Sequence, residues 1–94
     1  MRIEWLPAAE RNLRSIIDFI RKDNPRAARS VAEKVVYAVQ SLAENPMQGR
    51  SGRVSGTREL VIPSTPYIVP YAIGQTTIIV IRVIHGAQHW PSEF

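Results

Sequence analysis

Three apolar segments follow one another in the last third of the chain, and they constrain the fold more than any other feature. They cover residues 59–62, 67–73 and 77–84, with only short turns between them. Each is rich in β-branched or aromatic residues and is bounded by glycine, proline, serine or threonine, a pattern that predicts strands. Strands joined by short turns pair as antiparallel neighbours. We therefore expect a mostly antiparallel sheet in this part of the chain.

The first half of the chain predicts one short strand and two helices. Residues 3–5 form the strand, and Pro7 stands where a first helical turn tolerates proline. Apolar residues then recur at helical spacing to about Lys22. A second helix begins at Pro25 with Asn24 as its N-cap and continues to Asn45-Pro46. Because the connection is short, the two helices should lie side by side and antiparallel.

The order of these elements predicts an α+β fold in a single domain, residues 1–94. An N-terminal strand and an antiparallel helical hairpin would pack on one face of a mostly antiparallel four-stranded sheet. Strict alternation along 77–84 directs Ile79, Ile81 and Val83 toward the helices. The opposite, open face would then carry Ile78, Val80, Arg82 and Ile84. Pro70 removes one donor from its ladder, so its strand either bulges or has an unpaired side.

Charge and composition narrow the classes of partner. The net charge is +4, and ten of the twelve basic residues are arginine, whose planar head suits phosphates and carboxylates. An anionic partner, either nucleic acid or an acidic protein, is therefore expected. There is no cysteine, and two histidines make at most half of a zinc site, so we expect neither metal nor cofactor. No apolar run is long enough for a membrane span, which predicts a soluble, cytoplasmic protein without a membrane partner.

Residues 47–57 are rich in glycine and arginine and contain no acid, which predicts a mobile basic loop. Arg50, Arg53 and Arg58 lie in or beside it and could hold phosphate or a row of carboxylates. Alternatively, Arg58 makes an ordinary surface ion pair with Glu44 or Glu59. Glu59 could itself be a general base if desolvated, but a pairing with Arg58 or Arg82 is the preferred interpretation.

Two polar residues at the last strand are further candidates. Arg82 lies inside an apolar strand and needs a specific partner. His85 follows that strand and could move a proton near neutral pH, or it could cap the strand through a backbone hydrogen bond. Trp90 is expected to fold with the tail over an exposed edge of the sheet.

The chain resembles the RelE/ParE superfamily of toxins from bacterial type II toxin–antitoxin modules, most closely its ParE side. The resemblance covers nearly the whole length and rests on the order and spacing of short motifs. They are Trp5 with Ala8-Ala9, Asn24-Pro25-Arg26-Ala27-Ala28, Leu42 with Asn45-Pro46, Gly49-Arg50, Gly52-Arg53, Gly56-Thr57-Arg58-Glu59-Leu60, Pro66-Tyr67, Tyr71, and Val83-Ile84-His85-Gly86-Ala87 with Trp90-Pro91.

The resemblance implies a toxin that inhibits DNA gyrase by binding and that is neutralised by a cognate acidic antitoxin wrapped over its sheet. It also implies plasmid stabilisation and growth inhibition, and an operator bound only through the antitoxin complex. The antitoxin or target would contact Arg50, Arg53, Arg58, Ile78, Val80, Arg82, Ile84, His85 and Trp90. The RelE side of the superfamily implies an alternative, a ribosome-dependent mRNA endoribonuclease. Its catalytic candidates here are Arg58, Arg82 and His85, although Ile68 stands where those nucleases commonly carry an arginine.

Overall fold

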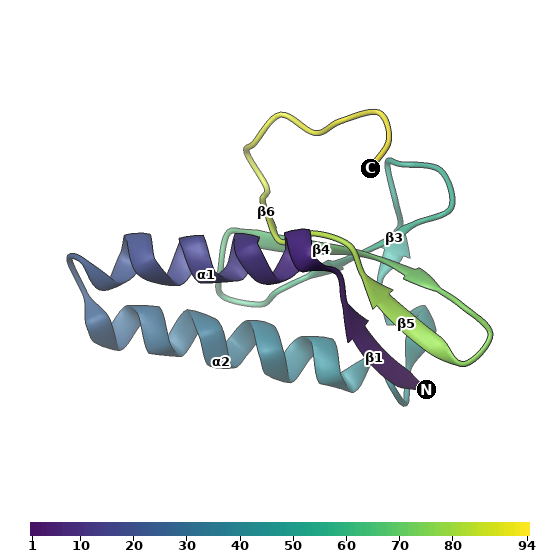
Figure 1. The fold of residues 1–94 in the computed structure, drawn as a ribbon, viewed down its shortest axis with the longest axis horizontal. Coiled ribbons are helices and arrows are strands. Elements are labelled where there is room, and N and C mark those ends of the chain that lie inside the picture. The colour runs from purple at the N-terminus through teal and green to yellow at the C-terminus, as the bar shows by residue number, and fades with distance from the viewer.

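The computed structural model describes all 94 residues and places two helices against one face of a mixed β-sheet (Figure 1). The elements in chain order are β1 (Arg2–Trp5), α1 (Pro7–Arg21), α2 (Pro25–Ser41), the 3₁₀ helix η1 (Pro46–Gln48), β2 (Arg50–Ser51), β3 (Arg58–Val61), β4 (Tyr67–Ile73), β5 (Thr77–Val80) and β6 (Ile84–His85). The predicted α+β class and the helical hairpin on one face of the sheet are confirmed.

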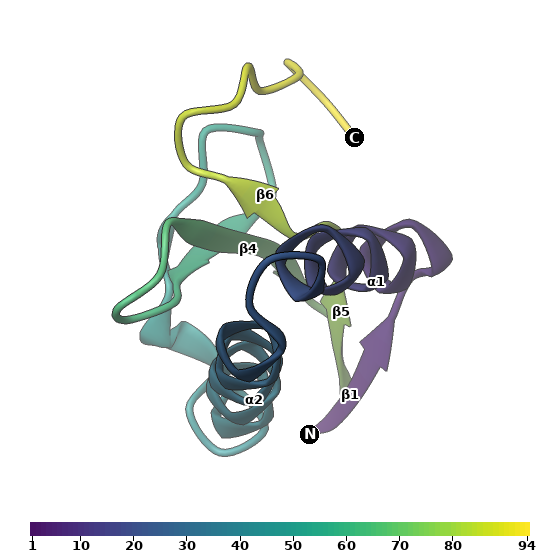
Figure 2. The same ribbon diagram turned by 90° about the vertical axis from the view of Figure 1, so that its left-hand side faces the viewer.

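Local sequence signals set the helix bounds. Pro7 and Pro25 occupy the first turns of α1 and α2, and the side chain of Asn24 accepts a hydrogen bond from the amide of Ala27 at 3.0 Å. The second helix ends at Ser41, slightly before the predicted Asn45-Pro46, because residues 42–44 turn into η1. Figure 2 looks along both helices and shows them packed side by side against the sheet.

The sheet differs in two details from the predicted four-stranded, mostly antiparallel one. Its strand order is β1-β5-β4-β3-β2, with β6 also paired to β4, so it has six strands. β1 runs parallel to β5, whereas the other pairs are antiparallel. Two strands have only two residues each, too few to show a period in the sequence. The sequence does not determine the direction of β1, because two helices and three strands separate it from its partner β5.

The hydrophobic core lies between the helices and the sheet. Its helical members are Ala9, Val35, Val39 and Leu42, and its sheet members are Leu60, Ile62, Val69, Tyr71, Ile78, Val80 and Val83. Ile78 and Val80 have no exposed surface, so the predicted open-face position of these two residues is wrong. The predicted helix-side position of Ile79 and Ile81 is wrong as well, because these two residues lie on the face of the sheet that points away from the helices.

A β-bulge explains this error. Val80 lies opposite Tyr71, and Ile84 lies opposite Ile68, so residues 81–83 of one strand face only residues 69–70 of the other. One extra residue shifts the alternation of side chains by one position. Val83 therefore joins Ile78 and Val80 on the helix side. The bulge lies beside Pro70, whose carbonyl accepts the amide of Ile81 at 3.0 Å.

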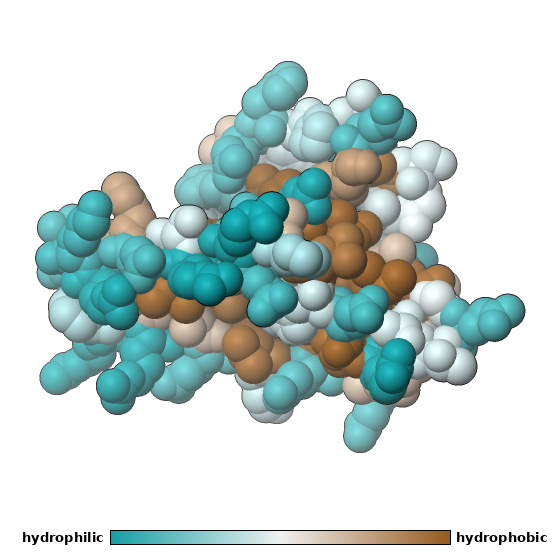
Figure 3. All heavy atoms as spheres, in the orientation of Figure 1, coloured by the Kyte–Doolittle hydropathy of each residue, from teal (hydrophilic) through white to brown (hydrophobic).

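The second face of the sheet is partly covered by the chain's own C-terminal segment, residues 86–94. This segment lies above the sheet (Figure 1), and its Trp90 ring contacts Arg53 of the loop between β2 and β3. Ile68, Ile81 and Ile84 of this face are each less than 9% exposed, as is Val54 in the loop between β2 and β3. Ile84 was predicted to be open to a partner, and the tail closes that part of the face. Hydrophobic atoms remain visible over β5, between the start of α1 and the tail (Figure 3).

Candidate target-binding surface

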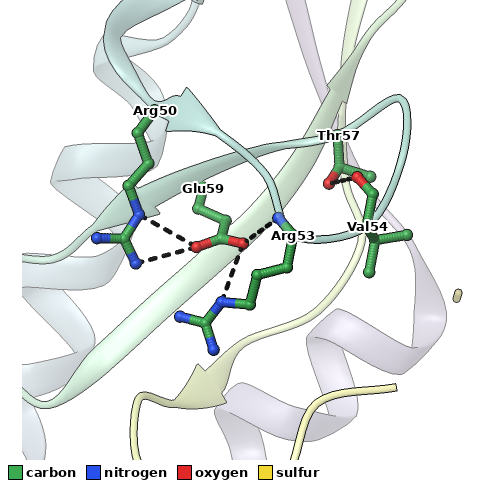
Figure 4. A network of polar contacts seen from close by, with 5 residues as sticks. All are labelled: Arg50, Arg53, Val54, Thr57 and Glu59. Atoms are coloured by element: carbon green, nitrogen blue, oxygen red, sulfur yellow. Dashed lines mark hydrogen bonds and ion pairs between the residues drawn. The ribbon is translucent and has the colours of Figure 1, made fainter. Parts of the chain in front are cut away.

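A buried carboxylate organises the loop that carries the first two arginines. β3 directs Leu60 into the core, so its neighbour Glu59 points to the second face, where it is 2% exposed. Oε1 accepts from Arg50 Nε at 3.2 Å and Nη2 at 3.0 Å. Oε2 accepts from the Arg53 amide at 2.7 Å and lies 3.4 Å from Arg53 Nε (Figure 4). The predicted pairing of Glu59 with Arg58 or Arg82 is therefore wrong.

These contacts keep Glu59 ionised. Burial by itself would raise the pKa of this carboxyl group, because the charged form loses hydration. The Arg53 backbone amide, the Arg50 side chain and the positive charges of both guanidinium groups outweigh that effect and hold the pKa of Glu59 below its ordinary value. A carboxylate held in this way is a structural anchor and not a general base.

The segment predicted as a mobile basic loop forms a hydrogen-bonded hairpin around this anchor. The amide of Gly52 donates to the carbonyl of Thr57 at 2.9 Å, and Thr57 Oγ1 donates to the carbonyl of Val54 at 2.7 Å (Figure 4). Gly49 must be glycine, because a Cβ there would lie 2.6 Å from Tyr71 Cε1 and 2.8 Å from the carbonyl oxygen of Glu59. The hairpin therefore presents Arg50 and Arg53 in defined positions.

Two arginines of the second face each contact an aromatic ring of the tail. The Arg53 guanidinium carbon lies 3.8 Å from the centre of the Trp90 ring, and that of Arg82 lies 5.5 Å from the centre of the Phe94 ring. The Trp90 and Phe94 rings are themselves 6.5 Å apart. We call these four residues together with Arg50 the arginine–aromatic surface. Through its contact with Arg53, Trp90 connects the C-terminal tail to this surface.

One polar group of the C-terminal tail makes no hydrogen bond within the chain. Trp90 Nε1 is buried and has no hydrogen-bond partner. A buried donor without an acceptor costs about 1–3 kcal/mol. The tail is held on the second face in part by the cation–π contacts of Trp90 with Arg53 and of Phe94 with Arg82.

Arg82 also borders a groove between α1 and the tail. The groove has a volume of about 380 Å³, and its polar lining residues are Asn12, Ser15, Arg82, Gln88 and His89. Arg82 Nη1 donates to the carbonyl of Ile81 at 2.8 Å, which leaves other donors of the guanidinium group available. Asn12 Oδ1 accepts the amide of Val83 at 3.1 Å and so ties α1 to the bulge.

Arg58 and His85 do not lie with Arg82. Arg58 pairs with Tyr71 in the sheet and donates from Nε to the carbonyl of Gly49 at 2.8 Å and from Nη2 to that of Met47 at 3.2 Å. His85 Nδ1 accepts the amide of Ala87 at 3.1 Å, and its ring packs edge-on against Tyr67 at 5.7 Å. No hydrogen bond or ion pair joins the three predicted catalytic candidates. The geometry of His85 matches the alternative capping interpretation.

Sequence reasoning missed Phe94 and the arginine partners of Glu59. A signal for Phe94 was present, since it is a second aromatic residue shortly after Trp90 in an otherwise polar tail. No group of three or more potential metal-binding side chains occurs. Neither helix combines the length and apolar character that crossing a bilayer requires.

Comparisons with known proteins find toxins of the ParE and RelE types. The profile of the family described as ParE toxin of type II toxin–antitoxin system, parDE, matches residues 3–90. A relative named putative toxin Y4kP from Sinorhizobium fredii is 44% identical over 90 residues, covering 96% of this chain and 93% of the relative. Toxin RelE2 of Caulobacter vibrioides is 30% identical over 87 residues, covering 93% and 97%. A solved structure described as the chromosomal ParDE TA system from P. aeruginosa superposes with a TM-score of 0.82 at 25% identity, covering 90% of this chain and 95% of that one.

Proposed function

We propose that this chain, which belongs to the ParE toxin family of type II toxin–antitoxin systems, inhibits DNA gyrase by binding to it. The observation that carries the proposal is the arginine–aromatic surface. Arg53 and Arg82 each face an aromatic ring, and the carboxylate beside Arg53, that of Glu59, is held by Arg50 and Arg53. Such a surface can bind an anionic or aromatic partner.

The chemistry of the surface suits a complex of protein and DNA. Arg53 uses Nε and its amide on Glu59, so the outer nitrogens of its guanidinium group remain available for carboxylate or phosphate oxygens. Trp90 and Phe94 offer flat apolar area that binds at low entropic cost. Complementary charge would speed the encounter and select the partner, while apolar contact would supply affinity.

A cognate antitoxin is the second proposed partner. The solved structure from P. aeruginosa is that of a ParDE toxin–antitoxin system, which supports this assignment. Its acidic and apolar residues would cover Arg53 and Arg82 and displace the tail from its present seat. Operator DNA would be bound only through the resulting complex. A toxin with a gyrase or ribosome target would act in the cytoplasm.

The alternative function is ribosome-dependent cleavage of mRNA. Two observations favour keeping it. A relative of 30% identity is named Toxin RelE2, and Arg82 shares a groove with His89, whose imidazole could move a proton. Arg58 and His85 are each engaged with backbone groups, which argues against the catalytic set that the resemblance implies.

Two parallel assays separate these functions. Purified chain is added to a gyrase supercoiling reaction and to a translation extract in which cuts in the message are mapped by primer extension. Loss of supercoiling with an intact message supports gyrase inhibition. Cuts in the message with normal supercoiling reject it in favour of the nuclease.

Substitutions test whether toxicity depends on the arginine–aromatic surface. Arg82→Ala should abolish toxicity in cells, because it removes one of the two guanidinium groups of the surface while leaving the core untouched. Arg26→Ala is the matched control, since Arg26 is an exposed arginine at the start of α2. Full toxicity of the Arg82→Ala variant removes this residue from the site.

A further inference from the structure

The outer edge of the sheet at β1 is unpaired. β1 is the terminal strand of the order β1-β5-β4-β3-β2. The amide of Arg2 donates to the carbonyl of Thr76, just before β5, at 3.1 Å, and the amide of Leu6 donates to that of Val80 in β5 at 2.9 Å. Because successive backbone groups of a strand alternate in direction, the amide and carbonyl groups of Ile3 and Trp5 point away from the sheet. An exposed edge of this kind is a template for another strand.

The side chains of this edge alternate between charge and apolar surface. Ile3 and Trp5 pair with Ile78 and Val80 and pack against the core on the helix side. Arg2 and Glu4 lie on the opposite side, and neither makes an ion pair within the chain. Next to the strand is an open groove of about 720 Å³ whose walls include Leu13, Ile17 and Val36.

We propose that β1 pairs with β1 of a second copy of this chain, antiparallel and centred on Ile3. In this register the outward groups of Ile3 meet those of the partner's Ile3 and exchange two hydrogen bonds. Arg2 then lies opposite the partner's Glu4, and Glu4 lies opposite the partner's Arg2. On the other side of the ribbon, Met1 and Trp5 of the two copies lie opposite each other. Met1 is 40% exposed, so it has apolar surface to contribute.

Charge complementarity favours a second copy over a different partner. A strand of uniformly acidic residues would match Arg2 but repel Glu4, and a basic strand would do the reverse. Only an alternating partner with the opposite order matches both residues, and the antiparallel copy has this order. The groove beside β1 also carries one acidic and one basic residue, Glu10 and Arg14 of α1.

The interface would be small. Five residues a side bury less than the roughly 1,600 Å² of a standard interface, so we expect a concentration-dependent dimer with a dissociation constant of about 1–100 μM. The inference does not depend on the cellular target of the chain, because β1 contributes no residue to the arginine–aromatic surface.

Charge reversal tests the register, with mass measured by sedimentation or light scattering over a range of concentrations. Glu4→Arg alone, or Arg2→Glu alone, places like charges opposite each other at two positions and should weaken the dimer roughly ten- to a hundredfold. The double variant Arg2→Glu/Glu4→Arg should restore it. An equimolar mixture of the two single variants should form a mixed dimer, because every cross-strand pair is then complementary. Glu33→Arg on the exposed side of α2 is the control for a change of net charge.

Each outcome of these measurements either supports or overturns pairing of β1 with β1 of a second copy. Dimers that the single variants weaken, and that the double variant and the mixture restore, support the proposal. A chain that is monomeric at several hundred micromolar overturns it, as does a dimer indifferent to these changes. Adding the cognate antitoxin identifies the competing occupant: if Glu4→Arg weakens antitoxin binding while the free chain stays monomeric, the edge belongs to the antitoxin and not to a second copy.

Discussion

The substitution Glu59→Gln should destabilise the protein strongly and in a pH-dependent way. It keeps the size of the side chain and removes its charge. Both oxygens of Glu59 accept hydrogen bonds only from groups of Arg50 and Arg53, and the carboxylate is almost fully buried. An amide has one acceptor oxygen and one donor nitrogen, so its nitrogen would face either the Arg50 side chain or the Arg53 amide, which are donors too.

The magnitude follows from the exposure of the partners. Removing one member of a buried ion pair costs about 3–5 kcal/mol when the remaining charge stays buried. Here the side chains of Arg50 and Arg53 are 53% and 44% exposed and can regain water. The remaining cost is that of lost hydrogen bonds to a charged group and one unsatisfied amide, about 2–3 kcal/mol. For a chain of this length, this corresponds to a decrease in Tm of roughly 10–15 °C.

The pH dependence gives an independent check. The pKa of Glu59 is lowered by folding, so its carboxylate stabilises the native state at pH values above the unfolded pKa of about 4.3. This contribution is lost as the pH falls through the lower, folded pKa, where the carboxyl becomes protonated. The difference in unfolding free energy between the native chain and Glu59→Gln should therefore be constant from pH 6 to 8 and shrink below pH 4.

Denaturant unfolding followed by circular dichroism at several pH values measures both effects. Glu44→Gln is the matched control, because Glu44 is exposed and makes no ion pair. Equal stability of Glu59→Gln and the native chain at pH 7 would refute the assignment of Glu59 as an anchor. A loss that persists unchanged at pH 3 would show that shape, and not charge, is what matters at this position.

Three further substitutions have defined outcomes. Tyr71→Phe removes a hydroxyl that donates to the Pro46 carbonyl at 2.6 Å and accepts the Gly49 amide at 2.9 Å, so thermal unfolding should show a loss of about 2 kcal/mol. Asn24→Ala removes the N-cap of α2 and should cost about 1 kcal/mol in the same assay; a neutral result would contradict the capping role. Trp90→Ala should cost at most about 1 kcal/mol, because it deletes a cation–π contact at a half-exposed arginine, yet it should abolish growth inhibition in cells; retained toxicity would exclude Trp90 from the target surface.

The sequence predicts the elements well because their signals are local. Proline at the helix starts, Asn24 at a cap and the bounds of β4 all depend on residues within a few positions of each other. The same local signals cannot specify how distant elements pair. β1 is joined to β5 only after the whole helical hairpin and three other strands have intervened, so its parallel direction is a property of the assembled sheet.

The predicted faces of residues 77–84 are partly wrong because the prediction assumes that side chains alternate without interruption along the whole segment. Alternation holds from Thr77 to Val80 and again at β6, but the bulge between them inserts one residue. The chemistry of Pro70 indicates an irregularity nearby, but it does not say which of the two strands takes the extra residue. For this reason Ile78 and Val80 were placed on the wrong side, while Val83 and Ile84 were placed correctly.

The candidate site was partly predictable for a related reason. Arginines near a glycine-rich segment and a tryptophan in the tail are visible as residue types, and Arg53 with Trp90 does form part of one surface. The partner of each arginine is not visible, because Arg58 adjoins Glu59 in sequence whereas the observed partners Arg53 and Arg50 lie six and nine positions away. Strand alternation separates them: Arg58 shares the side of Tyr71, whereas Glu59 lies on the side of the loop.

The bulge also makes the chain sensitive to length at one place. Deleting the codon for Ile81 would remove the extra residue and restore regular alternation from Val80 to Ile84, with Val83 still on the helix side and Ile84 still opposite Ile68 on the second face. Deleting the codon for Val83 would instead bring Arg82 opposite Val69 and turn its guanidinium group toward the core, where an unpaired charge is costly, and would take Arg82 away from Phe94. Turns such as residues 74–76 can gain or lose residues with little consequence, so changes of length should be tolerated there, whereas at the bulge the outcome depends on which residue is lost.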